Sequence, residues 1–266
     1  MQNLKTEIIY HQEISPAHFR LRARSAEIAH SARAGQFVHI LPRAVNFSFD
    51  PLLRRAFSIA ALQDDTFDVV YRVEGRGTAL LSRHQKGDTI DVLGPLGVPF
   101  APPVTKNILV GGGVGVPPLA MLAAQHEGDS TRRMTALVGA RSRDYLVCVD
   151  DLERSGLDVR VATDDGSVGV QGRVTELLEP MLADLAPDAE RPLVYSCGPL
   201  VMLRAVAKMC QTYRVPCQVS LEESMPCGVG VCNGCVVPLL NAADDYGAYR
   251  RICVDGPVMW SHEIAW

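Results

Sequence analysis

Hydrophobic and polar residues alternate in short runs through the first hundred residues of the chain. The alternation is visible at 18–24 and 66–73, and further runs lie at 36–41 and 89–93. A period of two is typical of a β-strand with one buried face. Glycine and proline separate the runs, and no strong helical period intervenes. The pattern predicts a small antiparallel β-barrel over residues 1–103.

The pattern changes after Pro102-Pro103. Largely apolar runs at 107–110, 134–138, 157–162 and 193–196 alternate with helical stretches at 117–125, 174–185 and 199–212. Buried strands that alternate with helices are typical of a parallel, doubly wound sheet. We therefore expect an α/β nucleotide-binding domain over 104–218. The remainder, 219–266, is rich in Gly and Cys, and we expect a small third domain there.

Composition narrows the functional classes. The 266 residues carry a net charge of −4, which gives no general attraction to nucleic acid. No apolar run approaches the roughly 18–20 residues needed to span a bilayer. The first residues lack the layout of a secretory signal. We expect a cytoplasmic protein that binds neither nucleic acid nor membrane.

Eight cysteines are concentrated toward the C-terminal end of the chain. Three of them follow the pattern C-x4-C-x2-C, and a fourth stands further on, which is the plant-type spacing of a [2Fe–2S] cluster. Glycines at 228, 230 and 234 permit the backbone angles with which a short loop curls around such a cluster. The candidate ligands are Cys227, Cys232, Cys235 and Cys253.

A zinc site is the alternative for the four cysteines, because zinc also accepts four thiolates. Zinc ribbons usually pair two C-x-x-C hooks, and only Cys232 and Cys235 have that spacing here. The spacing therefore favours iron and sulfur. The remaining thiols at 148, 197, 210 and 217 stand in apolar, helical or strand-end contexts. We expect Cys148, Cys210 and Cys217 to be buried and inert.

Arginine, aromatic and hydroxyl residues gather in the predicted barrel. Arg55-Ala56-Phe57-Ser58 stands where a strand should begin, Tyr71-Arg72 lies on another, and Gly75-Arg76-Gly77-Thr78 opens a helix. Arginines bind pyrophosphate bidentately, and a glycine turn offers backbone N–H groups to phosphate. Ser58 is suited to donate a hydrogen bond to a flavin ring nitrogen. From these residues alone, ordinary strands with solvated arginines remain an equal alternative.

A glycine loop follows the first strand of the second domain. Gly111-Gly112-Gly113-Val114-Gly115-Val116-Pro117 precedes a helix, which is the context of a dinucleotide pyrophosphate site. The loop departs from the standard fingerprint, since Pro117-Pro118 replaces a third glycine and no acid follows the second strand near Gly139-Ala140. A plain βα turn stays open as an alternative. Cys197-Gly198-Pro199 stands at a later strand end before a helix, and a tight βα turn with a buried thiol is likewise its alternative interpretation.

These features together resemble the ferredoxin–NADP reductase superfamily. Within it, the segment at 220–232, which ends in Met225-Pro226-Cys227-Gly228, closely resembles the electron-transfer subunits of class 1B dihydroorotate dehydrogenases. The run Cys253-Val254-Asp255-Gly256-Pro257-Val258 and the segment at 163–167 fit that family too. The resemblance covers nearly the whole chain.

The resemblance implies FAD, a [2Fe–2S] cluster and NAD(H). It assigns FAD to Arg55, Ala56, Phe57, Ser58, Val70, Tyr71, Arg72, Gly77 and Thr78. It assigns the nicotinamide nucleotide to Gly112, Gly113, Val114, Gly115, Val116, Cys197, Gly198 and Pro199. Ser58 and Cys197 are the candidate catalytic residues, with Cys197 near the ring that exchanges hydride.

The resemblance also implies a partner, an FMN-containing catalytic subunit in a heterotetramer that oxidises dihydroorotate to orotate in pyrimidine biosynthesis. Two departures stand out: Ala56, where the family often has proline, and a long insert before Cys253 that includes Asp244-Asp245-Tyr246-Gly247 and is expected to reshape a partner-facing loop.

Alternatives to this function stay open. One is the equivalent subunit of an NADPH–ferredoxin oxidoreductase or a sulfhydrogenase, in which Arg141 and Arg143 would bind the 2′-phosphate of NADP(H) rather than being solvated loop charges. The other is a zinc-stabilised nucleotide-binding module without redox activity.

Overall fold

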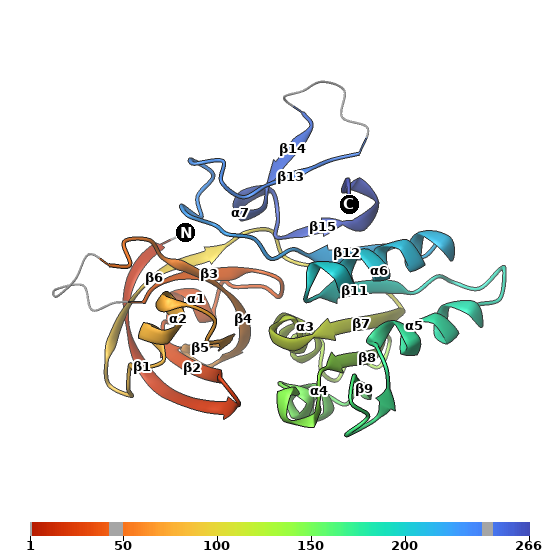
Figure 1. Cartoon of the computed structure of the whole chain (residues 1–266), viewed down its shortest axis with the longest axis horizontal. Helices are drawn as coiled ribbons and strands as arrows, with labels where there is room; N and C mark the ends of the chain where they lie inside the picture. The colour runs from red at the N-terminus through yellow and green to blue at the C-terminus, as the bar shows by residue number, and fades with distance from the viewer. Residues whose placement is uncertain (1, 43–49, 241–246) are drawn as a thin grey trace.

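Six antiparallel strands of the N-terminal region close into a barrel, on the left in Figure 1. The computed structural model describes residues 2–42, 50–240 and 247–266. Around the barrel the strands are β1 (Gln2–Ser15), β2 (His18–Arg24), β5 (Thr66–Arg72), β4 (Arg55–Gln63), β3 (Phe37–Leu41) and β6 (Thr89–Leu96). Two short helices, α1 (Ala26–Ala29) and α2 (Arg76–Leu81), accompany them. The predicted barrel is confirmed, and the long strand β1 adds to the predicted runs.

The middle of the chain forms a mixed seven-stranded sheet. Its strands are β7 (Lys106–Gly112), β8 (Arg133–Ala140), β9 (Asp158–Thr163), β10 (Val170–Gln171), β11 (Leu193–Cys197), β12 (Cys217–Ser220) and β15 (Val258–Trp260). Their order is β10-β9-β8-β7-β11-β12-β15, and all neighbours are parallel except β12 and β15. This confirms the predicted parallel sheet.

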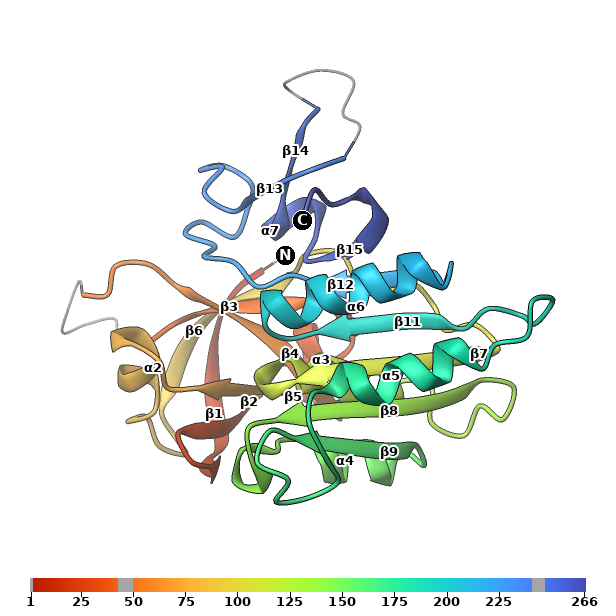
Figure 2. The ribbon, with the colours of Figure 1, turned by 45° about the vertical axis from the view of Figure 1, so that its right-hand side comes forward.

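Helices cover both faces of this sheet. They are α3 (Val116–Ala124), α4 (Val149–Arg154), α5 (Val174–Ala183) and α6 (Leu200–Thr212), with the single turns η1 (Gly113–Gly115) and η2 (Arg143–Tyr145). Helices α5 and α6 lie on one face and α3 and α4 on the other (Figures 1 and 2). The strand order reverses at β7, because β8 pairs with one edge of β7 and the later strand β11 pairs with its other edge. Ligands of such sheets bind at the carboxyl ends of strands where the order reverses in this way.

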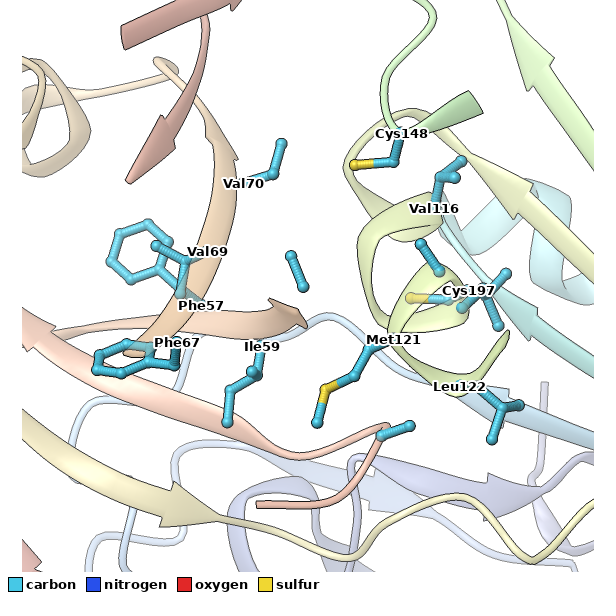
Figure 3. Close-up of a cluster of buried hydrophobic side chains, with 14 of the residues drawn as sticks. Phe57, Ile59, Phe67, Val69, Val70, Val116, Met121, Leu122, Cys148 and Cys197 are labelled. Atoms are coloured by element: carbon cyan, nitrogen blue, oxygen red, sulfur yellow. The ribbon is translucent and has the colours of Figure 1, made fainter. Parts of the chain in front are cut away.

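The barrel and the sheet share one hydrophobic core. Figure 3 shows Ile59 and Val70 of the barrel facing Val116 and Met121 of α3, and all four side chains are at most 4% exposed. Burying a side chain of this size contributes about 2 kcal/mol. Arg20 of β2 also forms an ion pair with Asp151 of α4. The two parts are therefore packed as one body.

A small C-terminal lobe sits above both parts (Figure 2). It contains β13 (Val236–Pro238), β14 (Tyr249–Arg251), α7 (Ile252–Asp255) and the turn η3 (Ser261–Glu263). Its last strand, β15, pairs with β12, and the Val98 N–H donates to the Gly256 carbonyl at 2.6 Å. Residues 258–260 thus extend the nucleotide sheet from within the expected third domain. Among the described helices, none is long and apolar enough to cross a membrane.

Candidate functional site

A cavity of about 730 Å³ opens between barrel strands β4 and β5 and the segment that follows β12. Its size is typical of a cofactor site. The predicted FAD residues that line it are Arg55, Ala56, Phe57, Ser58, Val70, Tyr71, Arg72 and Thr78. We call this cavity the first pocket. The structure therefore brings together nearly the whole set that was assigned to FAD.

Aromatic packing fixes Tyr71 in the wall of the first pocket. Its ring stacks on Phe19 with 5.7 Å between centroids, and Phe57 meets it edge-on at 5.4 Å. The hydroxyl lies 2.9 Å from Nε2 of His11, whose Nδ1 lies 2.7 Å from the His84 carbonyl. Burial raises the pKa of Tyr71, so the phenol stays neutral. The supporting role of His11, which lies on the unpredicted strand β1, gave no signal in the sequence.

Arg55 and the turn before α2 lie against each other. The Arg55 guanidinium donates to the carbonyls of Leu53 at 2.9 Å and Arg54 at 3.1 Å. A Cβ at Gly77 would lie 2.9 Å from Arg55 Nε, so the glycine leaves room for this side chain. The Thr78 hydroxyl accepts a hydrogen bond from the Glu74 N–H at 3.0 Å and ties the turn together. Gly77 thus supports the first pocket without lining it.

A second cavity of about 730 Å³, the second pocket, lies at the carboxyl ends of the central strands. Gly112, Gly113 and Pro199 line it, as expected for the nucleotide site. Arg141 also lines it, whereas the Arg143 guanidinium donates to the Ser167 carbonyl at 2.9 Å. Its lining further includes Asp164, from the segment 163–167 that fits the family, and Tyr145, Arg173 and Glu176, which no sequence pattern indicated.

The two pockets meet at the glycine loop. Arg72 lines both pockets, and Val114 lines the first pocket while its neighbours Gly112 and Gly113 line the second. A Cβ at Gly115 would lie 2.2 Å from the Cys197 carbonyl oxygen, so this glycine lets the loop rest on the end of β11. A ligand in one pocket is therefore adjacent to a ligand in the other.

Cys197 lies behind this junction rather than in either cavity. Its side chain is 1% exposed and lies near Val116 in the shared core (Figure 3). Burial raises the pKa of the thiol, although hydrogen bonds from Ser220 and Gly198 oppose the shift. The thiol is thus a neutral group that contacts Ser220 in the wall of the first pocket. Among the described residues that line the two pockets, Gly115, Val116, Cys197 and Gly198 do not appear.

The segment 220–226 forms the wall of the first pocket opposite the barrel and leads directly into Cys227. Glu222 of this segment remains exposed to the open pocket. Partial desolvation by the pocket walls, together with the charge of Glu74, raises the pKa of the Glu222 carboxyl. The sequence assigned no role to this acid, although it lies in the segment 220–232 close to the first cluster cysteine.

The loop at 227–235 curls through two glycines in left-handed backbone conformations, Gly228 at φ +69° and Gly230 at φ +79°. Cys227 is half-buried and Cys232 exposed, while Cys235 and Cys253 are buried. The Cys232 N–H points at Cys227 Sγ at 3.5 Å, and the Gly234 N–H points at Cys232 Sγ at 3.4 Å. Backbone donors therefore surround the exposed thiols.

The candidate ligands differ in how readily they ionise. Desolvation opposes ionisation of Cys227, but N–H groups of Cys232, Val229 and Val231 outweigh it and lower the pKa to about 6. Desolvation and the neighbouring Cys235 thiol raise the pKa of Cys253 to about 12.

His39 lies directly beneath the cysteine loop and was not anticipated from the sequence. It is 0% exposed, and neither ring nitrogen has a hydrogen-bond partner among the described residues. Desolvation and the charges of Arg54 and Arg55 lower the pKa of His39 to about 4. A neutral imidazole is therefore buried between the barrel and the loop.

Two other expectations concern residues outside these pockets. Cys148, Cys210 and Cys217 are buried, which confirms that part of the prediction for them. Residues 241–246 of the insert before Cys253, which include Asp244, Asp245 and Tyr246, lie outside the described residues.

Comparisons with known proteins agree with this geometry. A family model described as the iron–sulfur cluster binding domain of dihydroorotate dehydrogenase B matches residues 222–265, and an oxidoreductase NAD-binding domain model matches 109–208. The chain is 41% identical to the electron transfer subunit of dihydroorotate dehydrogenase B (NAD(+)) from Bacillus caldolyticus, over 86% of each chain. It is 35% identical to the homologous subunit from Aquifex aeolicus, over 99% of each.

A solved structure shares the whole architecture. A chain of the NADH-dependent reduced ferredoxin–NADP oxidoreductase, studied for flavin-based electron bifurcation, superimposes with a TM-score of 0.83 at 31% identity. The match covers 98% of this chain and 90% of that one.

Proposed function

The chain belongs to the family of dihydroorotate dehydrogenase B electron transfer subunits, and from this we propose that it carries electrons between a dihydroorotate-oxidising catalytic subunit and NAD. The observation that carries the proposal is the continuity of the sites. The second pocket adjoins the first, and the wall of the first continues into the cysteine loop. A nucleotide, a flavin and an iron–sulfur cluster would thus stand in one row.

The residues of the first pocket fit FAD. Arg55 and Arg72 supply positive charge for its pyrophosphate, since arginine binds phosphate oxygens bidentately. Phe57 and Tyr71 supply a rigid aromatic wall. The Ser58 hydroxyl is the donor that we assign to the flavin ring. When bound, FAD exchanges a hydride with the nicotinamide and releases electrons singly, and the cluster carries one electron at a time.

The residues of the second pocket fit the nicotinamide nucleotide. The glycine loop leads into α3, a helix of 9 residues, and Gly112 and Gly113 of this loop line the pocket where a pyrophosphate would lie. Val114 and Arg72 at the junction would bring the nicotinamide against the flavin. The Cys197 thiol stays protonated and supports the junction from behind, a role for which its neutral, buried state is suited.

The cysteine loop faces outward and suits contact with a partner. Val231 is 78% exposed and stands beside the exposed ligand Cys232. We propose that this edge meets an FMN-containing catalytic subunit, and that two copies of each subunit form a heterotetramer. Electrons from dihydroorotate would enter at this edge and leave as NADH during pyrimidine biosynthesis.

A second candidate is the equivalent subunit of an NADPH–ferredoxin oxidoreductase, which the 31% identity to that class of enzyme favours. Arg141 in the second pocket would then bind the 2′-phosphate of NADP(H).

Co-expression with the catalytic subunit from the same genome separates the two candidates. We expect a stable complex that reduces NAD when dihydroorotate is added, whereas the catalytic subunit alone does not reduce NAD. Absence of a complex, together with NADP reduction by reduced ferredoxin, would instead assign the chain to the second class.

A further inference from the structure

His39 is a polar residue in a strand whose other side chains are apolar. Every residue of β3 is buried, and Val38 and Ile40 point into the barrel core. Side chains alternate along a strand, so His39 points to the outer face with Phe37, which packs in the core of the sheet and lobe. The imidazole is therefore directed out of the barrel and into the space under the cysteine loop.

The cysteine loop rests on the imidazole ring. A Cβ at Gly228 would lie 2.5 Å from Cε1 and 2.6 Å from Nδ1 of His39, closer than any side chain can approach. Gly228 also has φ +69°, so both its backbone and its missing side chain are required here. Gly228 directly follows Cys227, the first candidate ligand. The ring thus supports the loop at its first ligand.

Both ring nitrogens lack a hydrogen-bond partner among the described residues, although the side chain is fully buried. Buried polar groups nearly always have partners, so an unpaired one calls for a group that the protein chain itself does not supply. In either tautomer the imidazole carries an N–H and needs an acceptor. The sulfur atoms of an iron–sulfur cluster are acceptors of this kind, and hydrogen bonds to them set the cluster potential.

We propose that His39 donates an imidazole hydrogen bond to a sulfur at the Cys227 end of the cluster, and that this bond raises the reduction potential of the cluster. The inference rests on the proposed function, because it requires the cluster. Reduction adds negative charge to the cluster, so a donor stabilises the reduced form more than the oxidised form. His39 is a positioning residue in this role, since it acts on the cluster through one hydrogen bond.

The position of His39 also relates the cluster to the first pocket. Its ring lies 5.6 Å from the ring of Phe37, which lines that pocket, and its backbone pairs with Ala56 of the same lining. One side chain therefore contacts the cysteine loop while its strand forms part of the pocket wall. A change in the cluster reduction potential caused by His39 would change the driving force for electron transfer between the cluster and a flavin in the first pocket.

Potentiometric titration of the holoprotein, monitored by electron paramagnetic resonance of the reduced cluster, tests the proposal. In His39→Phe, which keeps a ring but has no N–H, we expect the reduction equilibrium to become about tenfold less favourable, which is about 59 mV for one electron. His39→Asn keeps an N–H donor and should recover part of the shift. Ile40→Val alters packing on the opposite face of the same strand and should leave the potential unchanged. An unchanged potential in His39→Phe would overturn the proposal.

A second measurement needs no substitution at His39. In wild-type protein labelled with ¹⁵N-histidine, pulsed spectra of the reduced cluster should show hyperfine coupling to an imidazole nitrogen at hydrogen-bond distance. Absence of that coupling in protein that contains the cluster overturns the inference and leaves the proposed function standing. Absence of iron and cluster signals from wild-type protein overturns both.

Discussion

The four candidate cluster ligands differ in their surroundings, and the backbone of the loop causes the difference. Cys227 and Cys232 lie where N–H groups converge on sulfur, and the pKa of Cys227 falls to about 6 despite desolvation. Cys253 is buried beside Cys235 and its pKa rises to about 12, so this thiol stays protonated near neutral pH until a metal centre binds it. One half of the site is thus prepared for the cluster by the fold, and the other half depends on it.

Cys232 offers the most direct residue-level test of the cluster. It is exposed, so we expect Cys232→Ala to change the free energy of unfolding little while it removes one of four thiolates. Iron content and the visible absorption of the cluster should be lost, and FAD should remain bound. Cys210→Ala, which alters a buried thiol outside the loop, is the matched control and should retain iron. Iron at the wild-type level in Cys232→Ala would exclude Cys232 as a ligand.

The site residues divide into those that a sequence pattern can indicate and those that it cannot. Cysteine spacing reports the ligands directly, because the cluster dictates it. His39 and His11 occupy ordinary strand positions, and their importance comes from segments that the fold brings against them from far along the chain. A lone polar residue in the apolar run Phe37-Val38-His39-Ile40-Leu41 was the available signal for His39.

Among the elements, the strands and helices with clear periods were predicted within a few residues, and those defined by tertiary pairing were not. β7, α3, β8 and β11 follow buried runs or helical stretches that were visible in the sequence. β15 has only 3 residues and exists because it pairs antiparallel with the edge strand β12. No local pattern specifies such a strand, since its hydrogen bonds come from a segment about 40 residues earlier in the chain.

The turn between β7 and α3 requires glycine at position 115. A methyl group there would lie 2.2 Å from the Cys197 carbonyl oxygen, and backbone cannot move aside cheaply. We expect Gly115→Ala to displace the loop and raise KM for NADH at least tenfold, a loss of about 1.4 kcal/mol in binding. FAD and iron contents should stay near the wild-type values, as measured on the purified protein.

Gly156→Asn is the control for this substitution. Gly156 lies in the same domain with open space around its Cα, and asparagine tolerates its positive φ. Its KM for NADH should match the wild type. A wild-type KM in Gly115→Ala as well would show that the loop does not position the nucleotide.

At the scale of the whole molecule, the three parts meet around the first pocket and depend on one another. One hydrophobic core extends from the barrel into α3 of the sheet domain. The pairing of β12 with β15 connects the lobe to the sheet. The Arg20–Asp151 ion pair links the barrel to α4. Both side chains of that pair are partly buried, at 20% and 23% exposure. Such an arrangement holds the nucleotide, flavin and cluster sites at fixed separations.

The Arg20–Asp151 pair makes this interface sensitive to acid. Desolvation opposes ionisation of Asp151, but the Arg20 guanidinium outweighs it and holds the pKa of the carboxyl below its ordinary value. Because the pKa of Asp151 is lower in the folded state, the ion pair stabilises the fold fully at pH values above the unfolded-state pKa near 3.8. This stabilisation is lost as the pH falls through the folded-state pKa. Asp151→Asn should therefore lower the free energy of unfolding at pH 7 by about 1.5–3 kcal/mol.

Parallel urea denaturation of the wild type and Asp151→Asn from pH 7 to pH 3 checks the direction of this pH dependence. Loss of cofactor at low pH affects both proteins alike and cancels in the difference. The difference between them should shrink below about pH 4. Asp158→Asn, which removes an exposed pair with Arg160, should change stability by less than about 0.5 kcal/mol. A difference that stays constant down to pH 3 would contradict the assignment.

Anaerobic titration of the purified holoprotein with NADH, followed by absorbance and by electron paramagnetic resonance, tests the proposed electron path most directly. If the pockets and the cysteine loop form one path, NADH bleaches the flavin band and the signal of a reduced [2Fe–2S] cluster appears in the same samples. Protein that contains zinc and no iron, or a flavin and cluster that NADH leaves oxidised, would contradict the path from nucleotide to cluster.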